Sequence, residues 1–111
     1  MNILDNYRKI ITTTLKEYTR IPYAYGDIRT EAVFDSTNDR YVLVNVGWFN
    51  GQRDHTCLIH IDIIDGKVWL QRNDTEDSIA SILVEAGIPK EQIVLGLRPP
   101  EVRPYTVYAV A

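Results

Sequence analysis

The chain has 111 residues, of which 45% are hydrophobic and 24% are charged, which is typical of a folded globular domain and not of a disordered chain. Its formal net charge is −3, so it lacks the basic surplus with which proteins usually grip DNA phosphates on their own. The single cysteine, Cys57, allows no intramolecular disulfide, and no apolar run is long enough to span a membrane. We expect one cytoplasmic domain over residues 1–111, without a signal peptide and without membrane contact.

The N-terminal part of the chain has the residue spacing of an amphipathic helix. Apolar and aromatic residues recur there at intervals of three and four: Ile3, Leu4, Tyr7, Ile10, Ile11, Thr14, Leu15 and Tyr18. This spacing places them on one side of an α-helix. The pattern predicts a helix from about Asn2 to Tyr18.

Four β-strands are predicted next. The strand segments, rich in β-branched and aromatic residues, are 27–34, 40–48, 53–64 and 67–72. Residues 35–39 have the composition of a turn, and Asn50-Gly51 and Asp65-Gly66 are dipeptides typical of two-residue hairpin turns. This order predicts a four-stranded antiparallel meander.

The two-residue turns also predict the register of the strands that they join. The predicted pairs are Ile63 with Val68, Ile61 with Leu70, Asp62 with Trp69, His60 with Gln71, Tyr41 with His60, Val42 with Ile59, Leu43 with Leu58, Val44 with Cys57 and Ala32 with Val42. One face then collects a core of Val42, Val44, Val46, Cys57, Ile59, Ile61, Ile63, Val68 and Leu70. The other face is mixed and carries Tyr41, Leu43, Asn45, Thr56, Leu58, His60, Asp62, Trp69 and Gln71.

A second helix and a last strand complete the predicted fold. Asn73, Asp74 and Thr75 all suit the N-cap of a helix that begins after Arg72, and Gly87 suits its C-terminal end. Residues 105–111 alternate as a terminal strand does. We therefore predict a two-layer α+β domain, an antiparallel β-meander covered on one face by two helices, plus a C-terminal strand.

The mixed sheet face is the strongest functional signal in the sequence. Tyr41, Leu43, Leu58 and Trp69 would form an apolar strip if left bare, and exposed strips of this kind mark interaction surfaces. We predict an interaction surface of Tyr41, Leu43, Leu58, His60, Trp69 and Gln71. The alternative is that the N-terminal helix or the C-terminal strand covers this face.

His60 and Asp62 are the residues with the clearest catalytic chemistry. Two residues apart on a strand, they point to the same side, so His60 could act as a base oriented by Asp62, or both could bind a metal. His55 is predicted on the opposite face. In the alternative interpretation, His60 only forms a hydrogen bond to Gln71 or to the Tyr41 hydroxyl. Cys57, in the predicted core, is expected to be inert.

Arg98 and Arg103 flank the proline-rich segment before the C-terminus. Arginines beside aromatic residues can bind phosphate or stack on bases, so they are candidates for anion or DNA contact. The alternative is that ion pairs of these arginines fix the loop. No phosphate-binding glycine loop occurs in the sequence, and we expect neither a cofactor nor a metal.

Many short segments along the chain are those of a known family. They are Tyr7-Arg8-Lys9-Ile10-Ile11, Glu17-Tyr18, Tyr41, Val46-Gly47-Trp48, Ile59-His60-Ile61-Asp62, Gly66-Lys67-Val68-Trp69-Leu70-Gln71, Thr75-Glu76, Gly87-Ile88-Pro89, Ile93-Val94-Leu95-Gly96, Pro99-Pro100, Arg103, Tyr105-Thr106 and Ala109-Val110-Ala111. With this ordered set the sequence resembles the XisI family of cyanobacterial excision controlling factors, named for the fdxN element.

The resemblance implies an accessory role in the programmed removal of a DNA element by a separate recombinase, as in heterocyst differentiation. It also implies a XisH-type, nuclease-like partner, with DNA contacted only indirectly through a complex, and it supplies no catalytic residues. We expect a non-enzymatic control factor that contacts a XisH-type partner or a second copy of itself. The alternatives are a metal-assisted nuclease or hydrolase subunit using His60 and Asp62, and a DNA-binding protein using Arg98 and Arg103.

Overall fold

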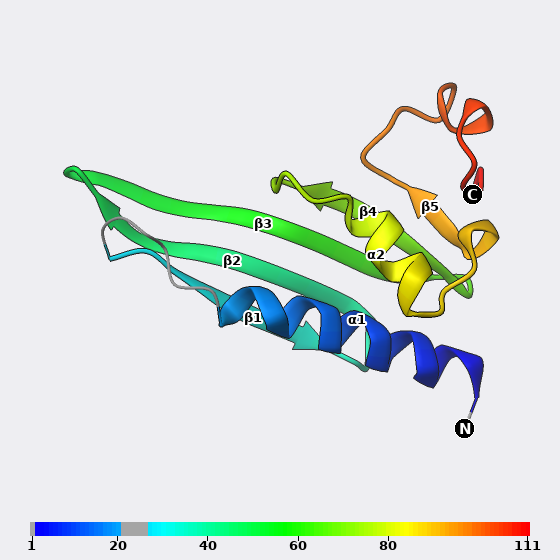
Figure 1. Cartoon of the computed structure of the whole chain (residues 1–111), viewed down its shortest axis with the longest axis horizontal. Helices are drawn as coiled ribbons and strands as arrows, with labels where there is room; N and C mark the ends of the chain where they lie inside the picture. Colours follow the sequence, from blue (N-terminus) through cyan, green and yellow to red (C-terminus); the bar gives the residue numbers. More distant parts are fainter. Residues whose placement is uncertain (1, 21–26) are drawn as a thin grey trace.

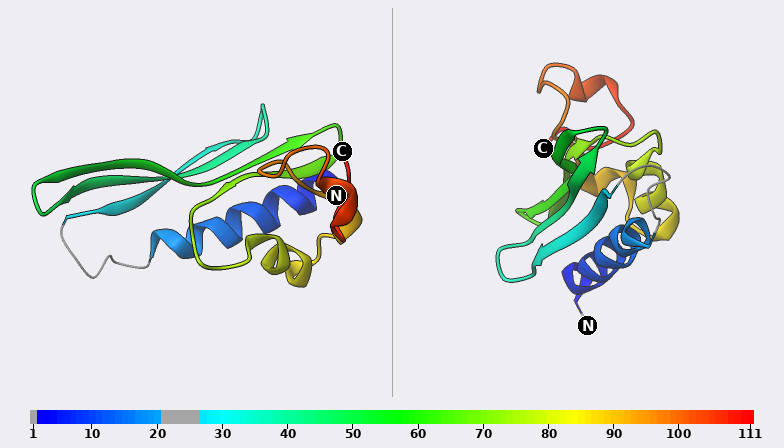
Figure 2. Two further views of the ribbon diagram at one scale, coloured as in Figure 1. Left: turned by 90° about the horizontal axis from the view of Figure 1, so that it is seen from above. Right: turned by 90° about the vertical axis from the view of Figure 1, so that its left-hand side faces the viewer.

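The computed structural model describes residues 2–20 and 27–111 (Figure 1). They form two helices, a five-stranded sheet and a C-terminal segment, which comprises residues 96–111. The elements are α1 (Ile3–Thr19), β1 (Arg29–Asp35), β2 (Arg40–Phe49), β3 (Gln52–Ile64), β4 (Lys67–Asn73), α2 (Ile79–Ala86), β5 (Ile93–Leu95) and the 3-10 turns η1 (Lys90–Gln92) and η2 (Arg103–Tyr105). Both helices lie on the same side of the sheet (Figure 2). The predicted α+β class is therefore confirmed.

Helix α1 agrees with the predicted helix to within one residue at each end. Asn2 caps it, because Asn2 Oδ1 accepts a hydrogen bond from the Asp5 N–H at 2.8 Å. Tyr7, Ile11 and Leu15 recur every four residues and are buried in the core. One side of α1 thus closes the core over the first strands of the sheet.

The sheet has the strand order β1-β2-β3-β4-β5, and β1 to β4 form the predicted antiparallel meander. The fifth strand, β5, is parallel to β4 and pairs Val94 with Trp69. The predicted terminal strand over residues 105–111 is wrong, since only Ala109 pairs there, in an isolated bridge to Val94. Prolines are the physical reason: the Pro99 and Pro100 carbonyls accept hydrogen bonds within tight turns, and Pro104 lies inside η2.

Both hairpin turns have the predicted chemistry. Asn50 and Asp65 each have a φ of 50°, and the glycines that follow them have φ values of 74° and 80°, as two-residue hairpin turns require. Close to the turns the register is also as predicted, with Ile63 opposite Val68, Asp62 opposite Trp69 and Ile61 opposite Leu70.

Farther from the turns, the predicted register is wrong by one residue because each long strand pair contains a β-bulge. Leu58 is the extra residue between β2 and β3, so Leu43 pairs with Ile59 and Tyr41 pairs with Ile61. Val42 accordingly pairs with His60, not with Ile59.

The second bulge and the first turn shift two further pairs. Between β3 and β4 the extra residue is Gln71, so His60 pairs with Arg72. The β1–β2 turn is tighter than predicted, and Ala32 pairs with Leu43. Contacts from β4 and from the residue after it satisfy the β3 carbonyls at the Leu58 bulge: Cys57 O accepts from Arg72 Nε at 2.7 Å, and Leu58 O accepts from Asp74 N at 2.8 Å.

The Leu58 bulge exchanges the two faces of β2 relative to the prediction. Tyr41 and Leu43 are fully buried beneath the helices, and Asn45 is buried beside them. The predicted core residues Val42, Val44, Val46 and Cys57 lie on the other face and are partly exposed. The core assignment is confirmed for the remaining residues, which are Ile59, Ile61, Ile63, Val68 and Leu70.

Helix α2 begins later than predicted. Ser78 is its N-cap residue, and residues 74–77 form a loop held by Asn73, the last residue of β4. Asn73 Oδ1 accepts from Thr75, and Asn73 Nδ2 donates to the Asp77 carbonyl. These side chains bond within the loop and so favour a turn over a helix start. The predicted end is confirmed: Gly87 has a φ of 123°, and Ile88 N–H donates to Leu83 O at 3.0 Å.

Candidate functional site

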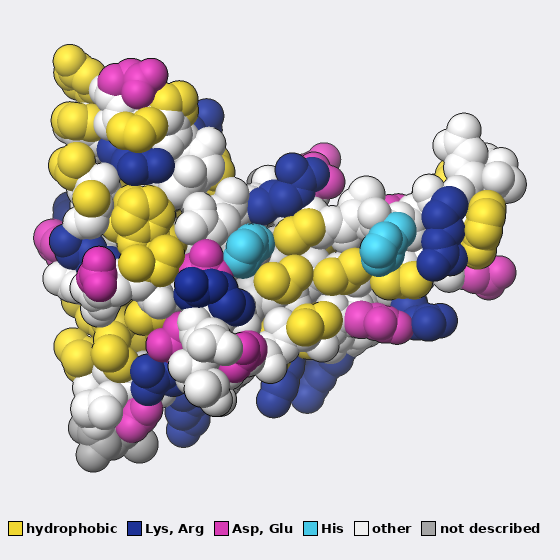
Figure 3. Space-filling view, turned by 180° about the vertical axis from the view of Figure 1, so that it is seen from behind, with side chains coloured by type: hydrophobic (Ala, Val, Ile, Leu, Met, Phe, Trp, Pro, Cys, Tyr) yellow, Lys and Arg dark blue, Asp and Glu magenta, His cyan; other side chains and the backbone are white. Residues whose placement is uncertain are grey.

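The side of the sheet that faces away from α1 and α2 is called the outer face (Figures 1 and 3). Strand pairing places the following residues on it: Val33, Val42, Val44, Val46, Trp48, Arg53, His55, Cys57, His60, Asp62 and Trp69. Figure 3 shows two histidine side chains on this face with hydrophobic side chains between them. The prediction that His55 and His60 lie on opposite faces is wrong, because the Leu58 bulge lies between them.

Half of the predicted interaction surface lies inside the protein. Tyr41 and Leu43 are fully buried, and Leu58 is largely buried in the same core cluster. No partner can reach Tyr41 or Leu43 without opening the fold, so these two residues are removed from the candidate surface. The other three predicted residues, His60, Trp69 and Gln71, lie on the outer side and keep partial exposure.

Asp62 is a buried carboxylate at the centre of a polar cluster on the outer face. Its Oδ1 lies 2.8 Å from His60 Nε2 and 3.6 Å from Arg40 Nε, and its Oδ2 accepts from Gln71 Nε2 at 3.3 Å. Both carboxylate oxygens thus have partners, as a buried charge requires. The hydrogen-bond partner of His60 is therefore Asp62 and not, as predicted, Gln71 or Tyr41, whose hydroxyl donates to Asp39.

Trp69 lies under the C-terminal segment instead of facing solvent. The Arg103 guanidinium carbon is 5.1 Å from the Trp69 ring centroid, a cation–π contact. Arg103 Nε also donates to the carbonyls of Leu95 and Arg98, at 3.3 and 3.1 Å. Arg103 thus fixes the loop, as expected in the alternative to anion or DNA contact. Its hydrogen-bond partners are backbone carbonyl oxygens, however, and not the carboxylates of ion pairs.

Gly96 allows the chain to cross close over Trp69 and Gln71. A Cβ atom at this position would collide with Gln71 Oε1 and would lie 3.0 Å from Trp69 Cε3. The backbone of the C-terminal segment therefore packs directly on two of the predicted surface residues. Arg98, the second predicted anion-binding residue, is exposed beside a small pocket of about 160 Å³.

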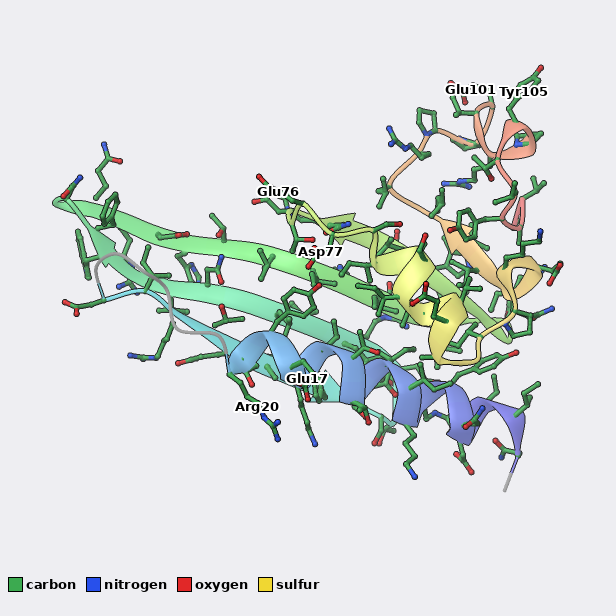
Figure 4. The ribbon with its side chains drawn as sticks, viewed as in Figure 1. Glu17, Arg20, Glu76, Asp77, Glu101 and Tyr105 are labelled. Atoms are coloured by element: carbon green, nitrogen blue, oxygen red, sulfur yellow. The ribbon has the colours of Figure 1, made fainter. Side chains whose placement is uncertain are left out.

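The C-terminal segment carries a second exposed apolar surface, which sequence reasoning missed. Its members, called the C-terminal strip, are Val102, Tyr105, Val107 and Val110. They are four of the nine large hydrophobic side chains that are exposed in the described residues, and Tyr105 is 90% exposed. The segment lies beyond β5 at the edge of the sheet (Figures 1 and 2), and Figure 4 shows Tyr105 pointing away from the body of the protein. Three nearby prolines were the signal that this segment would not form a strand.

A groove between the two helices has a volume of about 410 Å³. The Tyr18 hydroxyl closes one side of it by donating to Asp77 Oδ2 at 2.7 Å. Burial, aided by this hydrogen bond to a carboxylate, raises the pKa of Tyr18 to about 12. Figure 4 shows Glu17 at the C-terminal end of α1 and Asp77 in the loop before α2, facing this region.

Cys57 lies on the outer face and is half-buried. Burial raises the pKa of its thiol, which lowers the fraction of reactive thiolate at neutral pH. Within residues 2–20 and 27–111, no three His, Cys, Asp or Glu side chains are grouped as a metal site would require. No helix in those same ranges is long and apolar enough to cross a membrane.

The fold and its surfaces define a small α+β protein with a mixed five-stranded sheet, a sheet face that neither α1 nor α2 covers, and a C-terminal segment with exposed apolar side chains. The model of the XisI protein family matches residues 1–110, so the chain belongs to the XisI family. The resemblance inferred from the sequence is thereby confirmed.

Two solved structures are similar over nearly the whole chain. A XisI-like protein from Anabaena variabilis ATCC 29413 has 40% identity and a TM-score of 0.91, and the match covers 97% of this chain and 99% of that one. The fdxN element excision controlling factor XisI from the same strain has 27% identity and a TM-score of 0.85, with 99% of this chain and 100% of that one covered. The comparison with curated proteins gives no match.

Proposed function

We propose that this chain is a controlling factor for the programmed excision of a DNA element, acting as a non-enzymatic accessory subunit of a XisH-type partner. The proposal is supported by the match of the XisI family to residues 1–110. It is supported further by the similarity to an fdxN element excision controlling factor over the whole of that protein. The net charge of −3 favours contact with DNA through a complex over autonomous DNA binding.

The C-terminal strip is the surface that we assign to the partner. The observation that carries this assignment is the 90% exposure of Tyr105 on a segment held in place by Arg103. Exposed apolar side chains on a fixed backbone mark protein contacts, and tyrosine is among the residues that contribute most to binding. Because Arg103 already orders the segment, binding needs little further loss of conformational entropy.

The test is binding of the XisH-type protein from the same genome to purified variants of this chain. Tyr105→Ala and Val107→Asp should each weaken binding by about tenfold or more, as truncation of a central anchor does. Ile3→Ala is the matched control for Tyr105→Ala, because Ile3 is an exposed hydrophobic residue at the N-terminal end of α1, which lies apart from the C-terminal segment (Figures 1 and 2). Unchanged binding by correctly folded Tyr105→Ala and Val107→Asp would remove this surface, and absence of binding by the unaltered chain would remove the partner.

The second candidate function is hydrolysis at His60, and it is favoured by one specific contact. His60 Nε2 lies 2.8 Å from Asp62 Oδ1, and the His60 side chain is 34% exposed, so an oriented histidine reaches solvent. That is the arrangement of a general base and its orienting carboxylate. Nuclease and phosphodiesterase assays with and without divalent metal test it. Activity that is lost in His60→Ala and Asp62→Asn would establish this function, and activity that is absent or unchanged in both variants would eliminate it.

A further inference from the structure

A hollow of about 270 Å³ lies between α2 and the C-terminal segment. Three parts of the chain line it: Ser81, Val84 and Glu85 on α2, Lys90 in η1, and Val107 and Tyr108 in the C-terminal segment. Val107 is also a member of the C-terminal strip. The hollow therefore adjoins the surface that we assign to the partner.

Two lining residues join the hollow to the body of the protein. Val84 and Tyr108 are partly buried and pack against the hydrophobic core. The backbone is held at Tyr108 and at the next residue: Tyr108 N–H donates to Thr106 Oγ1 at 3.2 Å, and Ala109 N–H donates to Ile93 O at 2.8 Å. The hollow is thus formed before any partner binds, so filling it needs little rearrangement.

The size and lining of the hollow suit an apolar group better than water. An engineered apolar cavity of roughly 150 Å³ binds benzene, and this hollow, at about 270 Å³, is larger. Val84, Val107 and the Tyr108 ring offer water few hydrogen-bonding groups. An apolar group that displaces poorly bonded water gains affinity. The hollow therefore has room for one large apolar side chain, such as leucine, methionine or phenylalanine.

The charges at the rim of the hollow favour an uncharged occupant. Glu85 and Lys90 are both exposed, and they line the hollow with opposite signs. A cation there would be attracted by Glu85 and repelled by Lys90, and an anion would experience the reverse. Ser81, the remaining polar lining residue, already accepts a hydrogen bond from Ser78 Oγ at 2.9 Å. Neither a cation nor an anion therefore gains much from this rim.

The hollow is continuous with the C-terminal strip through Val107. Val107 is 67% exposed, and Tyr105, which is 90% exposed, lies two residues before it. A partner that covers both side chains thus reaches the edge of the hollow. Residues that dominate binding cluster in well-packed pockets, pair with such residues on the partner and are surrounded by contacts that exclude water.

We propose that the partner bound at the C-terminal strip inserts one large, uncharged apolar side chain into this hollow. The inference rests on the proposed function and adds to it the chemistry of the partner's contact residue. The two anchors are then reciprocal: Tyr105 of this chain contacts the partner, and the partner's apolar side chain enters the hollow between α2 and the C-terminal segment.

Substitutions that fill the hollow test the proposal by binding of the XisH-type protein from the same genome. Ser81→Trp adds bulk from α2, and Lys90→Trp adds it from η1. Each should raise the dissociation constant by about tenfold or more, because the partner's anchor no longer fits. Ser36→Trp and Lys9→Trp make the same two exchanges at exposed positions outside the hollow and should leave the dissociation constant unchanged. Circular dichroism checks that all four variants are folded.

Smaller substitutions test the chemistry of the occupant. Ser81→Ala removes the hydroxyl without adding bulk and should not weaken binding. Glu85→Gln and Lys90→Gln should each leave the dissociation constant within about threefold of that of the unaltered chain, since exposed rim charges contribute little. A tenfold loss in Glu85→Gln would show a cationic occupant, and the same loss in Lys90→Gln an anionic one. Either result would overturn the apolar anchor.

The hollow and the C-terminal strip can fail separately. Weaker binding by Tyr105→Ala, together with unchanged binding by folded Ser81→Trp and Lys90→Trp, would overturn this inference and leave the proposed function standing. Absence of binding by the unaltered chain would overturn both.

Discussion

Arg8 on α1 and Asp39 in the β1–β2 turn are joined by two hydrogen bonds, from Nε to Oδ1 at 2.7 Å and from Nη2 to Oδ2 at 3.1 Å. The Tyr41 hydroxyl donates to the same Asp39 Oδ1 at 2.9 Å. Asp39 therefore connects the helix, the turn and a core tyrosine. This contact helps to explain why Tyr41 points toward the helices and why the valines of β2 point outward.

Asp39 should make stability depend on pH in the acid range. The hydrogen bond from Arg8 lowers the pKa of Asp39, against the opposing effect of burial. A lowered folded pKa contributes stability that is present above the unfolded pKa of about 3.9 and is lost as the pH falls through the folded pKa. Asp39→Asn, which tolerates the φ of 56° at this position, should lower the melting temperature at pH 7. It should lower it much less at pH 2, and an equal loss at both pH values would contradict this role.

The exchange of faces on β2 can be measured by two alanine substitutions. Leu43→Ala removes a fully buried side chain and should cost about 2–5 kcal/mol of unfolding free energy. Val44→Ala, on the partly exposed face, should cost less than about 1 kcal/mol. Urea denaturation at sub-micromolar protein, where self-association contributes little, measures both. The opposite ranking would mean that the register without the Leu58 bulge is correct.

Local sequence patterns predicted the helices and most of the strands of this fold. Long-range contacts determine which face of the sheet each side chain occupies. The helical spacing from Tyr7 to Leu15 and the Asn50-Gly51 turn were sufficient for α1 and for the strand pairs near the turn. The Leu58 bulge has no marker in the sequence, because Cys57, Leu58 and Ile59 are all apolar. Its carbonyls accept hydrogen bonds from Arg72 in β4 and from Asp74 just after it, and no local sequence pattern predicts these contacts.

The candidate surface was predicted less well than the fold for the same reason. A one-residue shift moves every side chain of a strand to the other face, so it transferred Tyr41 and Leu43 from the predicted surface to the core. The C-terminal strip was missed because the alternation in residues 105–111 is also the pattern of a strand, which the preceding prolines prevent. Pro104 within η2 turns the chain and leaves Tyr105 exposed.

Two glycines should differ in their tolerance of alanine. A Cβ at Gly47 would collide with Asp27 O and lie 2.5 Å from Ile28 Cα, which is backbone and cannot move aside cheaply. At Gly96 the closest atom is Gln71 Oε1, at the end of a flexible side chain. Gly47→Ala should therefore destabilise more than Gly96→Ala.

The Gly96 clash should also be relieved by a second substitution. Gln71→Ala removes the atom in the way, so the double variant Gly96→Ala/Gln71→Ala should be less destabilised than the sum of its single variants. Thermal unfolding of the four proteins measures this coupling. Strict additivity would show that Gln71 does not limit the space above Gly96.

Tyr18 and Tyr41 should ionise at a higher pH than ordinary tyrosines. Burial raises the pKa values of Tyr18 and Tyr41 to about 12, with a further contribution from the hydrogen bonds to Asp77 and Asp39. A raised folded pKa gives stability that is present below the unfolded pKa of about 10 and is lost as the pH rises through about 12. Absorbance titration near 295 nm should show two late transitions, and Tyr18→Phe should remove one. Full ionisation of all tyrosines by about pH 10.5 in the folded protein would refute this.

The central functional claim is that a XisH-type partner binds the C-terminal strip, and hydrogen–deuterium exchange with and without that partner tests it most directly. The strip spans residues 102–110 on a segment fixed by Arg103. The account predicts slower exchange in residues 97–110 upon complex formation, with Ile3 and the rest of α1 unchanged. Protection confined to α1 and α2, with residues 97–110 exchanging as in the free chain, would contradict it.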